Sequence, residues 1–296
     1  FDPNNALLPG LTVRGNGFTI GEVELKVTAP GGKPFKIGSI IELKDVRIGV
    51  TNWTVNFDGS AQPAFDGSIF IATGGASLSI GGGDTFSTSV TDSTRDADDE
   101  AMRAEVTFTG GKVDGFAFKV DTFAMTIGSF LTMGAEDFYL DTRNSGTNDP
   151  LVVFGALTAD VTIGSWTIGG EGRNFYITGN GDFKPGNPFD SSKRFGVTLR
   201  VGGADGSNFK WPTWMPIRIY SIGLDWDDIE NKPWDFDLVV SATVATPPIK
   251  QLAFSGTIDG IRIRPSLLLE GKFPVIDIQA IGVTVAGSIY YVTINA

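Results

Sequence analysis

The sequence contains no cysteine and no histidine among its 296 residues. Without cysteine, the chain cannot form disulfides, zinc–thiolate sites, iron–sulfur clusters or a thiol nucleophile. Without histidine, it cannot assemble a Ser-His-Asp triad, a histidine general base or an imidazole-bound metal site. Any catalysis by this chain would have to use carboxylates, lysine or tyrosine.

Basic residues are also scarce. The chain has 23 Lys plus Arg against 34 Asp plus Glu, which gives a formal net charge of −11. Binding to nucleic acid or to anionic lipid headgroups requires an excess of basic side chains, so we expect neither partner. An acidic surface is typical of secreted proteins, and we therefore expect an extracellular or cell-surface location.

The longest uncharged run of the chain extends from 278 to 296. Polar side chains recur within it, and its alternation is typical of paired strands rather than of a membrane-spanning helix. We therefore expect no membrane insertion. The chain opens on Phe1 without an initiator Met or a signal peptide, which favours a piece of a longer protein.

Alternation of apolar and polar residues dominates the sequence and is clearest in Glu22–Val27 and Ile41–Ile48. A period of two predicts strands with one solvent-exposed face, and the 39 glycines suggest frequent turns between these strands. We predict an all-β fold of many short antiparallel strands, either a sandwich or an irregular β-solenoid-like stack. The prediction is a single large β domain over 1–296, with a weaker boundary near 179–192, where Gly, Asn, Pro, Asp and Ser crowd together.

Four of the six tryptophans lie close together and are interleaved with acids. Aromatic side chains beside carboxylates are typical of sugar-binding sites, because a sugar ring stacks on the aromatic face and its hydroxyls donate hydrogen bonds to the carboxylates. The predicted carbohydrate site consists of Trp211, Trp214, Trp226, Trp234, Asp225, Asp227 and Asp228. The alternative is that the tryptophans are core residues. An enzyme of this kind would be a glycoside hydrolase with two carboxylates, which the sequence does not single out.

Two acid-rich segments could offer oxygen ligands to calcium, the one cofactor that the sequence suggests. The candidate ligands are Asp92, Asp96, Asp98 and Asp99 in the first segment, and Asp141 and Asp149 in the second. Neither has the residue order of an EF-hand, and the alternative for both is a solvated loop. Several phenylalanines could instead line an apolar groove or form the core, namely Phe116, Phe118, Phe123, Phe130 and Phe138.

The last third of the chain resembles β-rich modules of very large secreted bacterial surface proteins. The resemblance is carried by the segments 211–217, 221–226, 256–261 and 271–277. It implies an extracellular structural or adhesive role and brings no catalytic residues with it. We therefore expect a non-catalytic module that contacts other copies of itself or matrix components and can build filaments through strand edges. A carbohydrate-binding or polysaccharide-cleaving protein is the alternative.

Overall fold

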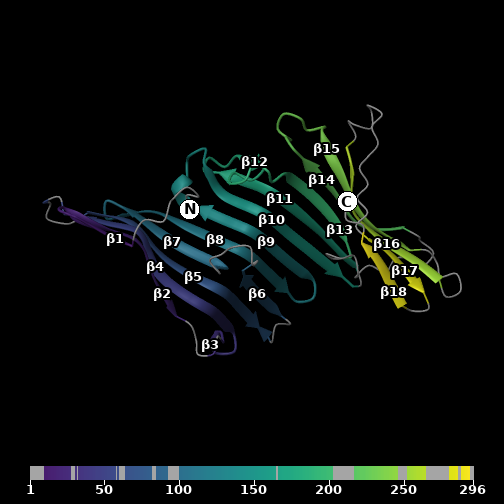
Figure 1. Ribbon diagram of the computed structural model, residues 1–296, viewed down its shortest axis with the longest axis horizontal. Coiled ribbons are helices and arrows are strands. Elements are labelled where there is room, and N and C mark those ends of the chain that lie inside the picture. Colours follow the sequence, from purple (N-terminus) through teal and green to yellow (C-terminus); the bar gives the residue numbers. More distant parts are fainter. Residues whose placement is uncertain are drawn as a thin grey trace. The chain divides into compact units, whose positions relative to one another are not determined.

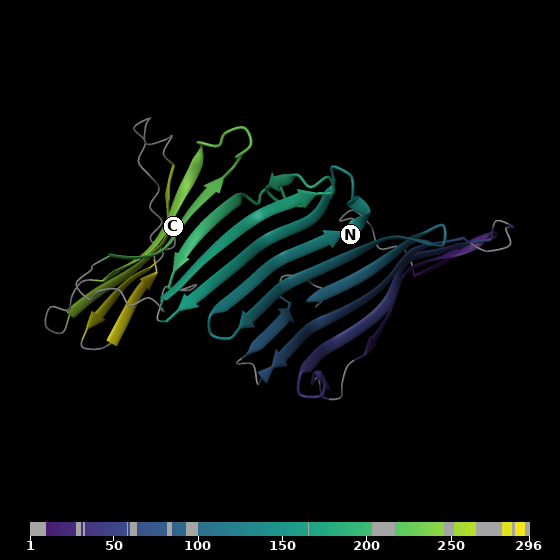
Figure 2. The ribbon, with the colours of Figure 1, turned by 180° about the vertical axis from the view of Figure 1, so that it is seen from behind.

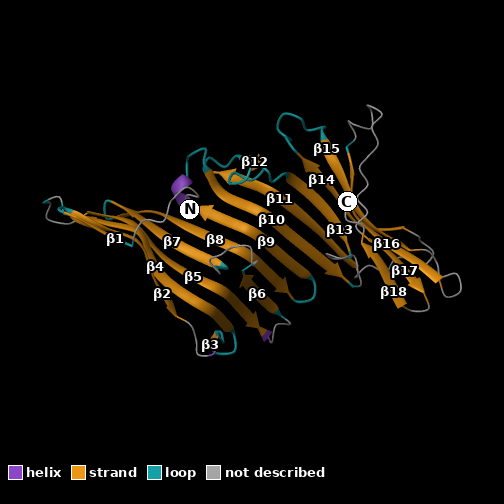
Figure 3. Cartoon of the chain, in the orientation of Figure 1, coloured by secondary structure: helices purple, strands orange, loops and turns teal. Residues whose placement is uncertain are grey.

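The computed structural model describes residues 10–27, 31, 33–57, 59, 64–81, 85–92, 100–164, 166–202, 217–245, 252–264, 280–285 and 288–293. About three quarters of these residues lie in β-strands, and helix among them is confined to short 3-10 turns such as Thr142–Asn144 (Figure 3). The all-β prediction is confirmed. Antiparallel pairing is also confirmed, since every strand pair with a described register is antiparallel.

The chain divides into two compact units. Unit 1 comprises residues 1–128, 134–155 and 176–184, and unit 2 comprises residues 129–133, 156–175 and 185–296. One of the crossings between them, from Lys184 to Pro185, falls within the segment 179–192 where the sequence predicts a weaker boundary. The strands β9 (Leu131–Asp141), β10 (Pro150–Ile163), β11 (Trp166–Thr178) and β12 (Phe183–Pro185) contain residues of both units.

Unit 1 is built around a meander of antiparallel strands that lie side by side in both views (Figures 1 and 2). Its strands are β1 (Leu11–Arg14), β2 (Gly17–Val27), β3 (Phe35–Ile37), β4 (Ile41–Asn56), β5 (Ala64–Ile80), β6 (Phe86–Thr91), β7 (Met102–Thr109) and β8 (Lys112–Ile127). The main hydrogen-bonded order is β2, β4, β5, β7, β8, and β6 pairs with the far ends of β5 and β8.

Unit 2 continues the same pattern of sequential antiparallel pairing. Its remaining strands are β13 (Phe195–Val201), β14 (Ile217–Trp226), β15 (Phe236–Ala245), β16 (Leu252–Ile263), β17 (Ala280–Val285) and β18 (Ser288–Thr293). β11 pairs with β13, and each strand from β13 onward pairs with the next strand along the chain. Such local pairing differs from a sandwich, in which two sheets face each other.

Several strands are longer than the sequence predicts. β4 has 16 residues and β5 has 17, whereas strands of globular proteins usually have 3–10. The prediction of short strands fails at Asp66-Gly67 and Asp259-Gly260, which have turn chemistry but lie inside β5 and β16. Gly110-Gly111 does form a turn, between β7 and β8, with both residues at positive φ.

Fully buried side chains are few among the described residues. Phe70 and Val153 are the largest side chains that are almost completely buried. Long aliphatic side chains such as Leu25, Ile48 and Ile71 are instead about half exposed. One face of the unit 1 sheet is therefore more exposed to solvent than the other, and the exposed face is the candidate site.

Candidate functional site: an apolar sheet face

Five strands of unit 1 place an unbroken apolar patch on one face of the sheet. Residues directly opposite each other in an antiparallel pair share a face, as do alternate residues along a strand. The registers run without a bulge through this patch and define two rows. The first row is Val23, Val50, Ile69, Val106 and Phe116, and the second is Leu25, Ile48, Ile71, Ala104 and Phe118. We call these ten residues the apolar stripe.

The apolar stripe is exposed. Six of its ten side chains are between 37% (Phe116) and 66% (Leu25) accessible to solvent. None of the ten carries a charge or a polar side-chain atom. Monomeric soluble proteins rarely leave large contiguous apolar patches in water, and such patches usually mark interaction sites.

The reverse face of the same strands is the covered one. Phe70 is 1% exposed and lies directly opposite Gly49, where an added Cβ would come within 2.6 Å of the Phe70 ring. The Arg103 guanidinium lies 3.6 Å from the centre of that ring, a cation–π contact. Glycine at position 49 is therefore required for the aromatic ring to lie flat across β4.

Buried charges surround this ring. Arg103 contacts Glu100 (Nη1 to Oε1, 3.5 Å) and Glu105 (Nε to Oε2, 3.4 Å). Arg47 also reaches Glu100, with 3.6 Å between Nη1 and Oε1. Arg47, Glu100 and Arg103 are each less than a tenth exposed. Burying charges is tolerated only when they are paired, and here each of the three has an opposite charge within 4 Å.

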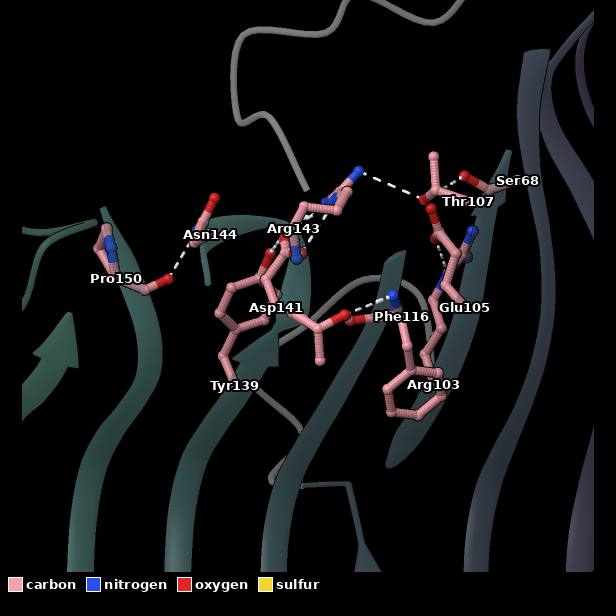
Figure 4. Close-up of polar contacts among 11 residues, drawn as sticks. Ser68, Arg103, Glu105, Thr107, Phe116, Tyr139, Asp141, Arg143, Asn144 and Pro150 are labelled. Atoms are coloured by element: carbon pink, nitrogen blue, oxygen red, sulfur yellow. Dashed lines mark hydrogen bonds and ion pairs between the residues drawn. The ribbon is translucent and has the colours of Figure 1, made fainter. Parts of the chain in front are cut away.

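A second polar cluster lies at the end of β9 (Figure 4). Asp141 accepts hydrogen bonds from Tyr139 Oη (2.9 Å) and from the backbone N (3.0 Å) and Nε (2.8 Å) of Arg143. Arg143 Nη1 donates in turn to Thr107 Oγ1 at 3.4 Å, across Gly115. The cluster thereby links β7 to the turn after β9.

The electrostatics of this cluster are those of a structural ion pair. Burial alone would raise the pKa of Asp141, but the hydrogen bonds from Arg143 and Tyr139 outweigh it and hold that pKa below its ordinary value. Burial and the neighbouring carboxylate raise the pKa of Tyr139 to about 12. Asp141 therefore stays ionised and Tyr139 stays protonated at neutral pH, and neither is poised for proton transfer.

In unit 2, a charged row runs across four strands. Arg173, Gly196, Asp225 and Asp237 are direct neighbours in successive pairs of β11, β13, β14 and β15. Arg173 Nη2 donates to Asp225 Oδ1 at 2.5 Å over Gly196, where a Cβ would collide with both side chains. Asp237 accepts from Arg194 Nη1 (2.9 Å) and Arg264 Nε (2.7 Å).

One of the predicted carbohydrate-binding acids, Asp225, belongs to this row, and a second, Asp227, lies two residues further along the chain. Asp225 is 7% exposed and paired with Arg173, while Asp227 pairs with Arg194 and Arg264. Burial would raise the pKa of Asp237, but Arg264 and Arg194 hold it below its ordinary value. A glycoside hydrolase needs one carboxylic acid with a raised pKa, so the geometry does not favour that chemistry at Asp237. Asp228 lies in a turn and accepts from Asn231.

The four predicted tryptophans are not brought together as one described platform. Trp226 is 9% exposed and stacks on Phe195 at a centroid distance of 5.7 Å, and its Nε1 donates to the Pro233 carbonyl at 2.9 Å. It is a packing residue, as the alternative prediction held. Trp234 is 85% exposed. Trp211 and Trp214 lie outside the described residues.

The candidate calcium ligands are likewise dispersed. Asp141 is engaged by Arg143 and Tyr139, Asp149 is exposed, and Asp92 lies just after β6. Asp96, Asp98 and Asp99 lie outside the described residues. Within the described part of the chain, no group of three or more acidic residues is arranged to hold a metal ion. Calcium binding remains a prediction.

The phenylalanines predicted to share a face are also divided. Phe116 and Phe118 lie on the apolar stripe, and Phe138 packs edge-on against Phe118 at 6.1 Å and against Phe154 at 5.2 Å. Phe130 belongs to the other unit. Phe116, for which the sequence predicts either an apolar groove or the core, is more than a third exposed.

Comparison with known proteins does not assign a function to these sites. No protein-family model, curated protein or solved structure matches the chain. Across the described ranges, no helix has the length and hydropathy that a membrane crossing requires.

Proposed function

We propose that this chain is a non-catalytic structural or adhesive module of an extracellular or cell-surface protein, and that it acts through the apolar stripe. The exposure of that stripe is the observation that supports the proposal. Its apolar side chains are exposed to water, whereas charged groups on the reverse face are buried. Exposed apolar surface is unfavourable in water, and a partner that covers the stripe would remove that free-energy cost. The acidic composition and the absence of Cys and His fit an exposed structural part.

The described charge clusters support the non-catalytic part of the proposal. The carboxylates of Asp141, Asp225 and Asp237 each form an ion pair with arginine. The pKa values of Asp141 and Asp237 lie below their ordinary value, because hydrogen bonds from arginine favour the ionised form. Such groups fasten neighbouring strands to each other. A polysaccharide-binding role would have to rest on the exposed Trp234 and on Trp211 and Trp214.

The proposal is tested by changing the stripe without changing strand propensity. A variant with Val23→Thr, Leu25→Thr, Ile48→Thr and Ile71→Thr keeps β-forming residues but adds hydroxyls. We expect it to fold, to bind less of an apolar dye such as anilinonaphthalene sulfonate, and to adsorb less to a hydrophobic surface. The matched control, Glu24→Thr with Lys26→Thr on the reverse face, should behave as the wild type. Equal dye binding by all three proteins would defeat the proposal.

A further inference from the structure

The size of the apolar stripe matches one half of a protein interface. Its ten side chains leave on the order of 700 Å² of apolar surface exposed, close to the ~800 Å² that each partner contributes to a standard interface. The rows cross five hydrogen-bonded strands without a bulge, so the surface is continuous rather than scattered. Two such surfaces would bury about 1,400 Å² in total, within the ~1,200–2,000 Å² of specific protein–protein interfaces.

The composition of the stripe suits a copy of itself. Aliphatic side chains such as Val23, Ile48 and Ile71 stand in regular rows, and the faces of two such sheets interdigitate at a separation of about 10 Å. A two-fold axis brings the same patch of both chains together and closes the assembly. Because the stripe has no ionisable group, the net charge of −11 on each chain is not concentrated at the contact.

We infer that the partner of the apolar stripe is a second copy of this chain, packed face to face about a two-fold axis that passes close to Ile69 and Ile71 on β5. This inference rests on the proposed function, since it names the partner of the same surface. A lipid surface is the competing occupant. The acidity of the chain disfavours anionic lipid headgroups, and an open sheet face covers only one side of an acyl chain.

The first experiment measures the oligomeric state of the full chain by sedimentation velocity over a range of concentrations. We expect a monomer–dimer equilibrium in the wild type. The double variant Ile48→Asp with Ile71→Asp should raise the dissociation constant at least a hundredfold, because each substitution enters the interface from both chains and the dimer would bury four unpaired carboxylates. Ile37→Asp is the matched control, since Ile37 is 59% exposed on β3 and lies outside the stripe. It should dimerise as the wild type does.

A second measurement uses the absence of native cysteine and does not depend on the aspartate variants folding. Ile71→Cys should be joined to its symmetry mate by a short bismaleimide that spans about 10 Å, the separation of packed sheets. Glu24→Cys is exposed on the reverse face and should not be cross-linked under the same conditions. Equal cross-linking of both variants, or equal dissociation by Ile37→Asp, would overturn the inference.

The outcomes separate this inference from the proposed function. A wild type that stays monomeric at all concentrations, yet binds dye through the stripe, overturns the second copy and leaves the proposed function standing. Monomers that bind phosphatidylcholine vesicles through the stripe overturn it in favour of lipid. A monomer whose dye binding is unaffected by the threonine substitutions defeats both.

Discussion

Removal of the Phe70 ring tests which face of unit 1 is its core. Phe70 on β5 and Phe116 on β8 are the same residue type on opposite faces of the unit 1 sheet, 1% and 37% exposed. Truncating a fully buried phenylalanine typically costs about 3–5 kcal/mol of the free energy of unfolding. The Arg103 contact adds about 0.5–2 kcal/mol, because its guanidinium loses the ring it lies on. Phe116→Ala removes a side chain already partly in water and should cost about 1–2 kcal/mol.

The two alanine variants are compared by urea denaturation followed by circular dichroism, at a concentration where sedimentation shows monomers. We expect Phe70→Ala to be the less stable by at least about 2 kcal/mol. Phe70→Leu should fall between the wild type and Phe70→Ala, since leucine fills part of the volume but offers no π-face. Equal losses, or a greater loss from Phe116→Ala, would refute the conclusion that the charged face is the covered one.

Five further substitutions probe two strand glycines, the Asp141 cluster and two tryptophans. Gly49→Ala should destabilise the protein by about 1–3 kcal/mol, because its Cβ meets the Phe70 ring. In the control Gly170→Ala the atom nearest the new Cβ is 3.9 Å away, so stability should change by less than about 1 kcal/mol. Thermal melts of the two variants compare these effects directly. Asp141 has a lowered folded-state pKa, so its ionised form stabilises the protein above the unfolded value of about 3.9, and this contribution disappears as the pH falls through the folded pKa. Asp141→Asn should therefore lower stability at pH 7 and lessen its decline below about pH 4, as urea titrations at several pH values would show. Trp226→Ala should cost about 3–5 kcal/mol and Trp234→Ala less than about 0.5 kcal/mol, and a destabilisation by Trp234→Ala as large as that by Trp226→Ala would contradict their observed burial.

The sequence predicts the strands well where side chains alternate strictly. In Glu22–Val27 the apolar residues Val23 and Leu25 do share one face, and the charged residues share the other. The same alternation does not reveal which face is covered. That depends on Phe70 on β5, whose ring extends over Gly49 of β4, and on Arg103 of the adjacent β7, which lies on that ring. Contacts of this kind can be predicted only once the registers are known.

The candidate sites were predictable to different degrees. Tyr139, Asp141 and Arg143 alternate along the chain and so lie on one side of it, a signal that could have identified their hydrogen-bonded cluster. Trp226 gave no such signal, because its stacking partner Phe195 comes from another strand 31 positions earlier. The spacing of residues along the sequence thus indicates contacts within one strand. It does not distinguish a tryptophan of a binding platform from a tryptophan of the core, because that distinction depends on which strands pair.

Glycines inside the strands explain how a sheet without a described second layer covers one of its faces. In unit 2, the Arg200–Asp160 ion pair lies over Gly169, and the Arg173–Asp225 pair lies over Gly196. In unit 1, Arg143 crosses Gly115 to reach Thr107, as the Phe70 ring crosses Gly49. Each glycine removes the side chain that would otherwise hold the two partners apart, so long side chains from adjacent strands lie flat and shield the backbone. None of the ten stripe positions is a glycine, and six of the ten side chains are more than a third exposed. The sheet's own charged side chains thus cover one face, and the glycine content supports this architecture as well as its turns.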